Sequence, residues 1–312
     1  MIEMVIDARR KDLGGFEVGR ILPYAKRRMV GPFIFLDHMG PAEFAPGADA
    51  INVRPHPHIG LSTLTYLFEG EIMHHDNLGF TQAIRPGEVN WMTAGKGIVH
   101  SERTDPLKKA QGGPMNGMQA WIALPDEAED MDPGFFHHGE ADLPAYENGG
   151  LFARLVAGSA YGAAAAVKTS SPLFYVHWEM KEGVRTTPPS GKGSGGMSER
   201  ALYVAKGQIE IGDRTFHEGQ MIVLEANAEP TVKSLVPSTV MALGGEPVGE
   251  RLIWWNFVAS SQARIDAAKA DWTAGRMTLP HDDDQEFIPL PDEPAVAARE
   301  PEPVEPKPTD PV

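Results

Sequence analysis

The sequence predicts an all-β protein of two similar domains, followed by a short helix and an acidic, proline-rich tail. Three observations predict this architecture. The 312 residues exceed one ordinary domain, which usually takes roughly 100 to 200 residues. Many of the 33 glycines and 27 prolines separate short apolar runs such as 31–36 (GPFIFL) and 64–68 (LTYLF), a spacing typical of sandwiches and barrels. A strand–turn–strand pattern also occurs twice.

The repeated pattern divides the chain into two domains. Each copy is expected to form two strands joined by a tight turn, followed by a further strand. The matching segments are TYLFEGEI (65–72) with LYVAKGQI (202–209), and RPGEVNWMTA (85–94) with HEGQMIVLEA (217–226). We therefore expect an N-terminal domain over residues 1–140 and a C-terminal domain over residues 150–258.

The C-terminal end differs in composition from the two domains. Within residues 259–281, Ile265, Ala268 and Trp272 recur at helical spacing, so we expect a helix there. Residues 282–312 are acidic and rich in proline, with few large apolar side chains. A segment of this composition cannot bury a core of its own, and we expect a disordered tail.

Charge and cysteine content exclude several classes of function. The chain has 28 Lys and Arg against 43 Asp and Glu, a formal net charge of −15, whereas direct nucleic-acid binding needs a basic surface. It has no cysteine, which excludes disulfide frameworks, thiolate metal sites and cysteine nucleophiles. It shows no signal-like leader and no membrane-length apolar run. We expect a cytoplasmic protein that binds neither nucleic acid nor membranes.

Two short motifs in the first domain, RPHPHIG and GKGIVHSE, point to a metal site. His56 and His58 are two residues apart, as are His100 and Glu102, and alternate residues of a strand share a face. Two neighbouring strands that present these pairs inward would bring three imidazoles and one carboxylate together. Such a set of nitrogen and oxygen ligands fits iron(II), nickel, manganese, copper or zinc.

The second copy of the repeat offers a comparison for this site. The positions that match the four candidate ligands there are Gly193, Gly195, Val232 and Ser234. None of these residues carries an imidazole or a carboxylate. We therefore expect the C-terminal domain to be free of metal.

Longer segments around the two motifs resemble a known family. RPHPHIGLSTLTYLFEGEIMHHDNLG (54–79) and RPGEVNWMTAGKGIVHSE (85–102) are similar to the signature of the pirins, which are bicupins of the cupin superfamily. Further segments resemble pirin segments in the same order, namely VGPFIFLDHMGP (30–41), GMQAWIALP (117–125) and GGEPVGERLIWWNFVASS (244–261). The resemblance covers about residues 1–276. It implies two small jelly-roll β-barrels side by side.

The resemblance also implies a ligand set and a cofactor. His56, His58, His100 and Glu102 match the positions with which pirins hold one metal ion in the N-terminal domain. The metal of this family is usually iron, so iron(II) is the expected cofactor, with nickel, manganese, copper and zinc as alternatives. The acidic tail departs from the family pattern.

Two functions of different classes follow from the resemblance. Some pirins are similar in activity to quercetin 2,3-dioxygenase, which opens the flavonol heterocycle with O2 and releases carbon monoxide. In such a reaction Glu102 is the expected catalytic residue, because it can take the proton of the substrate's 3-hydroxyl as a general base. We expect this activity on a small aromatic substrate. The alternatives are an iron-dependent regulator that binds a transcription factor or a metabolic enzyme, and a metal-stabilised scaffold without turnover.

Two further groups have mainly structural interpretations. His74, His75 and Asp76 follow a predicted hairpin, where we expect a solvated or structural role, the alternative being a hydrogen bond to a metal ligand. Trp254 and Trp255 are adjacent in a predicted strand, so one of them must face inward. We expect it to pack in the core rather than to line a groove.

Overall fold

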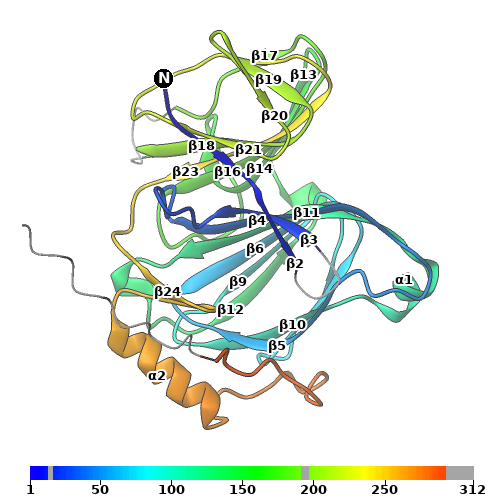
Figure 1. The fold of residues 1–312 in the computed structure, drawn as a ribbon, viewed down its shortest axis with the longest axis vertical. Coiled ribbons are helices and arrows are strands. Elements are labelled where there is room, and N and C mark those ends of the chain that lie inside the picture. The colour runs from blue at the N-terminus through cyan, green and yellow to red at the C-terminus, as the bar shows by residue number, and fades with distance from the viewer. Residues whose placement is uncertain (13–16, 191–196, 293–312) are drawn as a thin grey trace, which may run out of the picture.

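The computed structural model describes residues 1–12, 17–190 and 197–292. These residues form two β domains, one above the other in Figure 1, with helix α2 (Gln262–Thr273) at the lower end. Each domain is a jelly roll in which a large sheet faces a four-stranded sheet. Among the described strands, no ladder joins the two sheets of a domain, so the predicted barrels are sandwiches of two sheets rather than closed rings.

The first domain has a seven-stranded and a four-stranded sheet. The large sheet runs in the order β12 (Gly134–His138), β9 (Val89–Thr93), β6 (Leu61–Glu69), β11 (Gly113–Ala123), β4 (Phe33–Phe44), β3 (Glu17–Leu22) and β2 (Arg9–Asp12). The small sheet runs in the order β5 (Asn52–His58), β10 (Ile98–Arg103), β7 (Ile72–Asp76) and β8 (Thr81–Ile84).

The second domain repeats this plan. Its large sheet runs in the order β1 (Ile2–Asp7), β21 (Gln220–Leu224), β18 (Glu199–Lys206), β23 (Ser238–Gly245), β16 (Leu173–Met180), β14 (Leu151–Ala160) and β13 (Ala145–Asn148), with β15 (Ala163–Ala164) beside β14. Its small sheet runs in the order β17 (Arg185–Thr186), β22 (Val232–Ser234), β19 (Gln208–Ile211) and β20 (Arg214–His217).

The first strand of the chain belongs to the second domain's sheet. β1 falls within the expected N-terminal domain, residues 1–140, but it pairs with β21. Ile6 lies opposite Met221 and is buried in the core between the two domains. This exchange covers an edge of the large sheet that would otherwise present unpaired backbone groups.

Strand register confirms the sequence repeat. In the sheet orders, β6 takes the place of β18 and β9 takes the place of β21. Tyr66 lies opposite Val89, and Tyr203 lies opposite Met221, which are the pairs that the sequence match predicts. The two domains therefore correspond residue by residue along these strands.

The outer faces of the two large sheets pack against each other. Their shared core includes Trp91 of the first domain and Tyr175 of the second. Two reciprocal hydrogen bonds cross it: one joins the Tyr66 hydroxyl to His177 Nδ1 at 2.9 Å, and the other joins the Tyr203 hydroxyl to His38 Nδ1 at 2.9 Å. The interface is thus apolar packing with two hydrogen-bonded Tyr–His pairs buried in it.

The C-terminal segment wraps back onto the first domain. The hairpin β24 (Leu252–Trp254) and β25 (Phe257–Ala259) leads into α2, which buries Ile265, Ala268 and Trp272 as the sequence predicts. Further helical turns lie at α1 (Pro106–Gln111), η1 (Asp126–Ala128) and η2 (Glu140–Asp142). Sequence analysis missed α1 because it buries no side chain. None of the helices in the described part of the chain is long and apolar enough to span a membrane.

The predicted disordered tail is ordered over its first part. Asp283 accepts hydrogen bonds from Ser101 and Arg103 of β10, and the Ile288 amide donates to the Pro55 carbonyl at 2.9 Å. Residues 282–292 therefore lie against the first domain, held by charges that this segment meets only in the folded protein. The remainder of the expected tail, 293–312, lies outside the described residues.

Candidate metal centre

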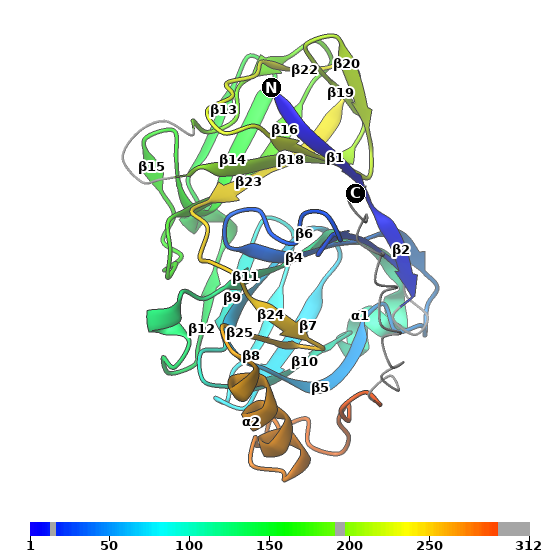
Figure 2. The ribbon, with the colours of Figure 1, turned by 60° about the vertical axis from the view of Figure 1, so that its left-hand side comes forward.

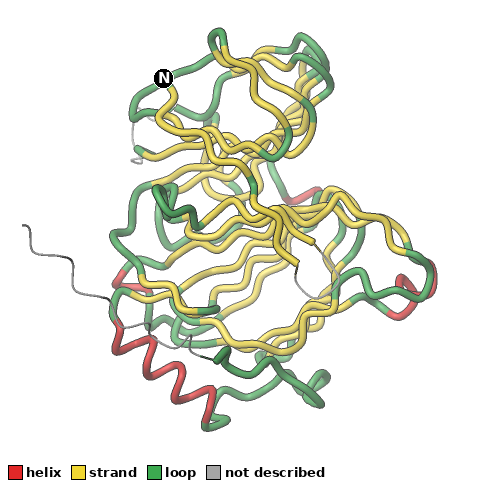
Figure 3. Tube along the Cα trace, viewed as in Figure 1, coloured by secondary structure: helices red, strands yellow, loops and turns green. Residues whose placement is uncertain are grey.

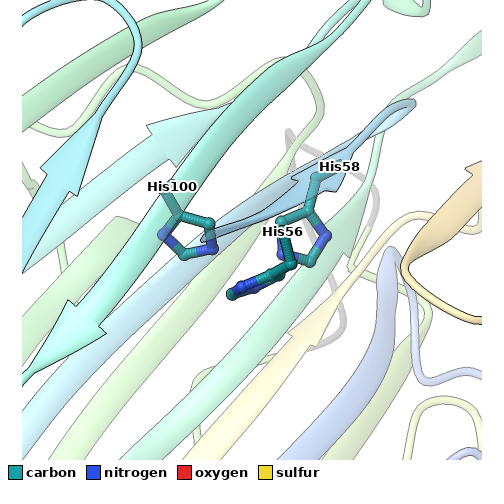
Figure 4. Close-up of side chains that lie close together, drawn as sticks. All are labelled: His56, His58 and His100. Carbon is teal, nitrogen blue, oxygen red and sulfur yellow. The ribbon is translucent and has the colours of Figure 1, made fainter. Parts of the chain in front are cut away.

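Three imidazoles meet inside the first domain. β5 and β10 are neighbours in the small sheet, with His100 opposite His56 and Ile98 opposite His58, so the three rings project from adjacent strands (Figure 4). One ligand nitrogen from each lies within 4.8 Å of the others. Within residues 1–12, 17–190 and 197–292, this is the one group of three or more side chains placed to hold a metal ion.

Hydrogen bonds fix which nitrogen of two of these rings is free. His56 Nδ1 donates to the Arg54 carbonyl at 2.9 Å, and His58 Nδ1 donates to the Asn256 carbonyl at 3.0 Å. Because a carbonyl oxygen only accepts, both Nδ1 atoms carry the proton, and both Nε2 atoms keep a lone pair. The two rings are therefore held as the tautomer that binds a metal through Nε2.

The third ring is held by a chain of side chains. His100 Nδ1 lies 3.4 Å from His74 Nδ1, and His74 Nε2 lies 2.9 Å from Asp76 Oδ2. Asp76 Oδ1 accepts from the amides of Leu78 and Phe80, at 2.9 and 3.1 Å. With the His74 proton directed to the carboxylate, His74 Nδ1 accepts from His100 Nδ1. This leaves His100 Nε2, which is buried without a partner among the described residues.

Adjacent residues of β7 therefore differ in their surroundings. His74 is buried and stacks on Phe135, with ring centroids 4.3 Å apart. His75 contacts Asp282 of the C-terminal segment through Nδ1 at 2.9 Å. Of the three residues expected to be mainly structural, His74 thus takes the alternative role beside the candidate ligand His100, and Asp76 reaches that ligand only through His74.

Burial keeps the three imidazoles neutral. It lowers the pKa of His56 to about 4, and it lowers the pKa values of His58 and His100 well below their usual range. A metal binds the neutral imidazole. Each ring is therefore in its binding form at neutral pH.

The predicted fourth ligand, Glu102, is not part of this group. A bulge between β10 and β5 places Glu102 opposite Val53, so the simple pairing of the two motifs ends at His100. The Glu102 carboxylate is not among the mutually close ligand atoms, although it lines the same cavity. Burial raises its pKa to about 7.

The cavity beside the triad has a volume of about 660 Å³. One wall is aromatic, since Phe35 and Trp121 stack with ring centroids 4.1 Å apart. Another wall is polar, where Arg20 Nε and Nη2 donate to the two oxygens of Asp37, both at 2.9 Å. Trp254 and Trp255 both pack against the core cluster that includes Phe257, as expected, and Trp255 also lines the cavity.

Sequence reasoning did not single out Arg20, Asp37 or Trp121 as site residues, although Asp37 and Trp121 lie in the segments 30–41 and 117–125 that resemble pirins. They come from β3, β4 and β11, which become neighbours only in the sheet. Their positions in the sequence alternate with residues of the interdomain core, such as Leu36 and Ala120. That alternation is the one signal that could have assigned them to the interior face.

The second domain has neither an imidazole nor a carboxylate at the expected counterparts of the metal ligands that the structure describes, Val232 and Ser234. The sequence match that pairs Ile72 with Ile209 also pairs His74 with Ile211. Glu102 lies opposite His74, and Val232 lies opposite Ile211. Val232 therefore takes the place of Glu102 and not of His100. The sequence match misplaced it because the connection before β22 differs in length from the one before β10. Gly193 and Gly195, the other expected counterparts, lie outside the described residues.

The donor atoms suit a transition-metal ion. Three buried imidazoles bring one ligand nitrogen each within 4.8 Å of the others, His100 Nε2 is buried without a partner among the described residues, and a carboxylate lines the same cavity. Nitrogen ligands with a carboxylate fit iron, nickel, manganese, copper and zinc alike. The residues therefore fit a divalent metal without selecting one.

Comparison with known proteins agrees with the fold. Residues 15–122 match the family model Pirin, and residues 175–278 match the Pirin C-terminal cupin domain. The chain is 60% identical to a pirin-like protein of Caulobacter vibrioides over 94% of its own length and all of the relative's.

Solved structures show the same likeness. A quercetin 2,3-dioxygenase from Acinetobacter baumannii superposes with a TM-score of 0.84 at 32% identity, covering 94% of this chain and 96% of that one. A second quercetin 2,3-dioxygenase structure from the same organism gives a TM-score of 0.81 at 25% identity, covering 89% and 98%. With both domains matched in order, the chain belongs to the pirin family.

Proposed function

We propose that this protein is a metal-dependent dioxygenase that opens an aromatic, flavonol-type substrate with O2. The observation that carries the proposal is the histidine triad at the wall of a 660 Å³ cavity with one aromatic and one polar side. A pocket of this size and lining is typical of small-molecule sites. The 32% identity to the Acinetobacter quercetin 2,3-dioxygenase supports the same reaction class.

His56, His58 and His100 would hold the metal through Nε2, with Glu102 as the fourth ligand. When bound, the metal would act as a Lewis acid towards the substrate's 3-hydroxyl and 4-carbonyl oxygens and would provide a position for O2. Iron(II) is the proposed metal, with nickel, manganese, copper and zinc as alternatives. The hydrogen bonds at Nδ1 of the three rings would leave each Nε2 unprotonated for the metal.

Glu102 would take the proton of the substrate's 3-hydroxyl. Burial raises the pKa of this carboxyl to about 7, and a general base is most effective when its pKa lies near the working pH. Glu102 lines the same cavity as the triad, so it is on the side from which the hydroxyl would approach. The proton would rest on a carboxylate oxygen while the substrate anion reacts.

The two walls would orient the substrate. The stacked rings of Phe35 and Trp121 offer a flat apolar surface, and the Trp121 ring lies 5.1 Å from His58. Arg20, fixed by Asp37, presents a cation to hydroxyl groups at the far end of the substrate. Residues of the C-terminal segment, including Ile288, complete the wall and limit the entry of water.

An oxygen-dependent assay on quercetin tests the proposal. Metal-loaded protein, mixed with quercetin without oxygen and then with O2, should consume the flavonol and release carbon monoxide. Glu102→Gln should keep most of its metal, since an amide oxygen remains, but should lose turnover by roughly 100-fold or more, the usual size of a general-base effect. Glu127→Gln, at an exposed acidic residue of η1, is the matched control and should retain activity.

Each possible failure points elsewhere. Unchanged turnover in Glu102→Gln would remove the base role from this residue. Bound metal without any turnover would favour the regulatory alternative, in which the protein binds a protein partner instead of converting a substrate.

A further inference from the structure

A glutamine of the large sheet faces the metal cavity. Gln119 lies on β11 between Met118 and Ala120, whose side chains are buried in the interdomain core. Because successive residues of a strand point to opposite faces, Gln119 points to the interior of the first domain. Figure 2 shows β4, β6 and β11 side by side in this domain, and Figure 3 draws the same sheet in yellow. Gln119 is partly exposed and lines the cavity together with Trp121, two residues farther along the strand.

The Thr65 hydroxyl fixes which end of the Gln119 amide is turned away from β6. Thr65 lies opposite Gln119, and its Oγ1 donates to Gln119 Oε1 at 2.8 Å. No other acceptor for this hydroxyl lies among the described residues, and a reversed amide would leave the hydroxyl proton without one. The Oε1 atom is therefore held against β6, and Nε2 is the end left for other partners.

Both N–H groups of this amide are available. Gln119 Nε2 has no hydrogen-bond partner among the described residues, yet it is not one of the unpartnered polar atoms that are closed off from solvent there. The carboxylate opposite Gln119 on β4, that of Asp37, is engaged by Arg20 through two bonds of 2.9 Å. Gln119 therefore presents accessible donors at the cavity wall, and a ligand can supply the acceptor.

The surroundings favour a neutral oxygen as that acceptor. Arg20 and Asp37 neutralise each other beside the amide, so an ionised group of a ligand would find no net charge there to replace its hydration. A flavonol that chelates the metal through its 3-hydroxyl and 4-carbonyl oxygens would have these two atoms occupied. The hydroxyl groups on its outer rings are neutral acceptors that remain.

We propose that Gln119 is a specificity-determining residue that donates a hydrogen bond from Nε2 to a phenolic hydroxyl on an outer ring of the substrate. The inference rests on the proposed function, because a flavonol-type substrate supplies this hydroxyl. It narrows the substrate class to flavonols that are hydroxylated on an outer ring. It also makes Thr65 a positioning residue, which holds the amide in the orientation that the contact needs.

Two flavonols isolate the contact. Quercetin and 3-hydroxyflavone share the chelating pair of oxygens, but 3-hydroxyflavone has no other hydroxyl. Titration calorimetry on metal-loaded, full-length protein without oxygen gives both affinities independently of turnover. Wild-type protein should bind quercetin more tightly than 3-hydroxyflavone. Gln119→Met should weaken quercetin binding by roughly three- to tenfold, the value of one neutral hydrogen bond, and should change the affinity for 3-hydroxyflavone by less than about twofold.

Further variants separate the contact from damage to the fold. In Gln119→Met combined with Thr65→Val, both partners become apolar groups of similar shape, so no hydroxyl is left unpaired. This double variant should show the same selective loss for quercetin. Thr65→Val alone frees the amide to turn and should lose part of the quercetin affinity, again without affecting 3-hydroxyflavone. Gln82→Met, on β8 and outside the cavity, is the matched control and should leave both affinities unchanged.

The outcomes distinguish this inference from the proposed function. An equal loss of affinity for both flavonols, or a preference for quercetin that survives the double variant, would overturn the role of Gln119 and leave the proposed function standing. So would wild-type protein that does not prefer quercetin. If wild-type protein bound neither flavonol, the flavonol substrate itself would be refuted, and the role of Gln119 with it.

Discussion

Removal of the His74 imidazole tests how the metal ligands are held. His74→Ala would take away the acceptor for His100 Nδ1 and leave the Asp76 carboxylate facing an empty space. His100 could then turn, or carry its proton on Nε2 and lose the lone pair that the metal needs. Loss of such an outer partner typically costs 10- to 100-fold in metal affinity, about 1.4 to 2.8 kcal/mol. We expect the upper half of this range, because the stacking on Phe135 is lost as well.

Cobalt(II) is a useful probe for this prediction, since both its affinity and its visible spectrum can be measured without turnover. Competition with a chelator of known affinity gives the change in binding, and the absorption bands report ligand geometry. His75→Ala is the matched control on the same strand, because His75 contacts Asp282 rather than a candidate ligand. His74→Gln should recover part of the affinity, since its amide oxygen can accept from His100.

Asp76→Asn sharpens the same test. The Asp76 Oδ1 atom accepts from two backbone amides, so an asparagine would keep its oxygen there and turn its NH2 group towards His74. His74 would then carry its proton on Nδ1, facing the proton of His100. Affinity within twofold of wild type in both His74→Ala and Asp76→Asn would refute the reasoning, as would an equal loss in His75→Ala.

Three further predictions follow from the structure. Tyr66→Phe leaves His177 Nδ1 without its partner in the interdomain core. It should lower the free energy of unfolding, measured by urea denaturation, by about 1 to 3 kcal/mol. Tyr146→Phe, at an exposed position, should change this free energy little. For metal-free protein, the free energy of unfolding should fall by on the order of 3 kcal/mol as the pH drops from 6.5 towards 4. The reason is that His56 takes up a proton in the unfolded chain but not in the folded protein. An equal dependence on pH in His56→Ala would contradict this. Chelation should lower the Tm of wild-type protein but not of His56→Ala, since an ion that binds only the folded state stabilises it by about 2.7 kcal/mol at 100 times its Kd.

Much of the fold was predictable because it repeats. The match between the segments around Tyr66 and Tyr203 predicted two domains, and the strand register agrees with it. The sequence of β1 indicates a strand but not its partner, and its pairing with β21 depends on how the two domains pack. The sequence did not predict that residues 282–292 are ordered, for a related reason. Asp283 contacts Arg103 only in the folded protein.

The alternation of side chains along a strand predicted part of the site. Alternation brought His56, His58 and His100 to one face correctly, but a bulge in the pairing of β5 with β10 changed the surroundings of Glu102. Alternation also places His74 and Asp76 on one face of β7, although no local signal shows that this face is turned to His100. Such contacts depend on the tertiary structure and leave no trace in a short motif.

Reaction with ¹⁸O-labelled O2 tests the central claim most directly. Purified protein with a measured metal content would be mixed with quercetin under labelled oxygen, and the products analysed by mass spectrometry. The proposal predicts that both atoms of one O2 enter the ring-opened product, that carbon monoxide is released, and that neither occurs in His56→Ala. Oxygen atoms derived from water, or bound metal without consumption of quercetin, would contradict it.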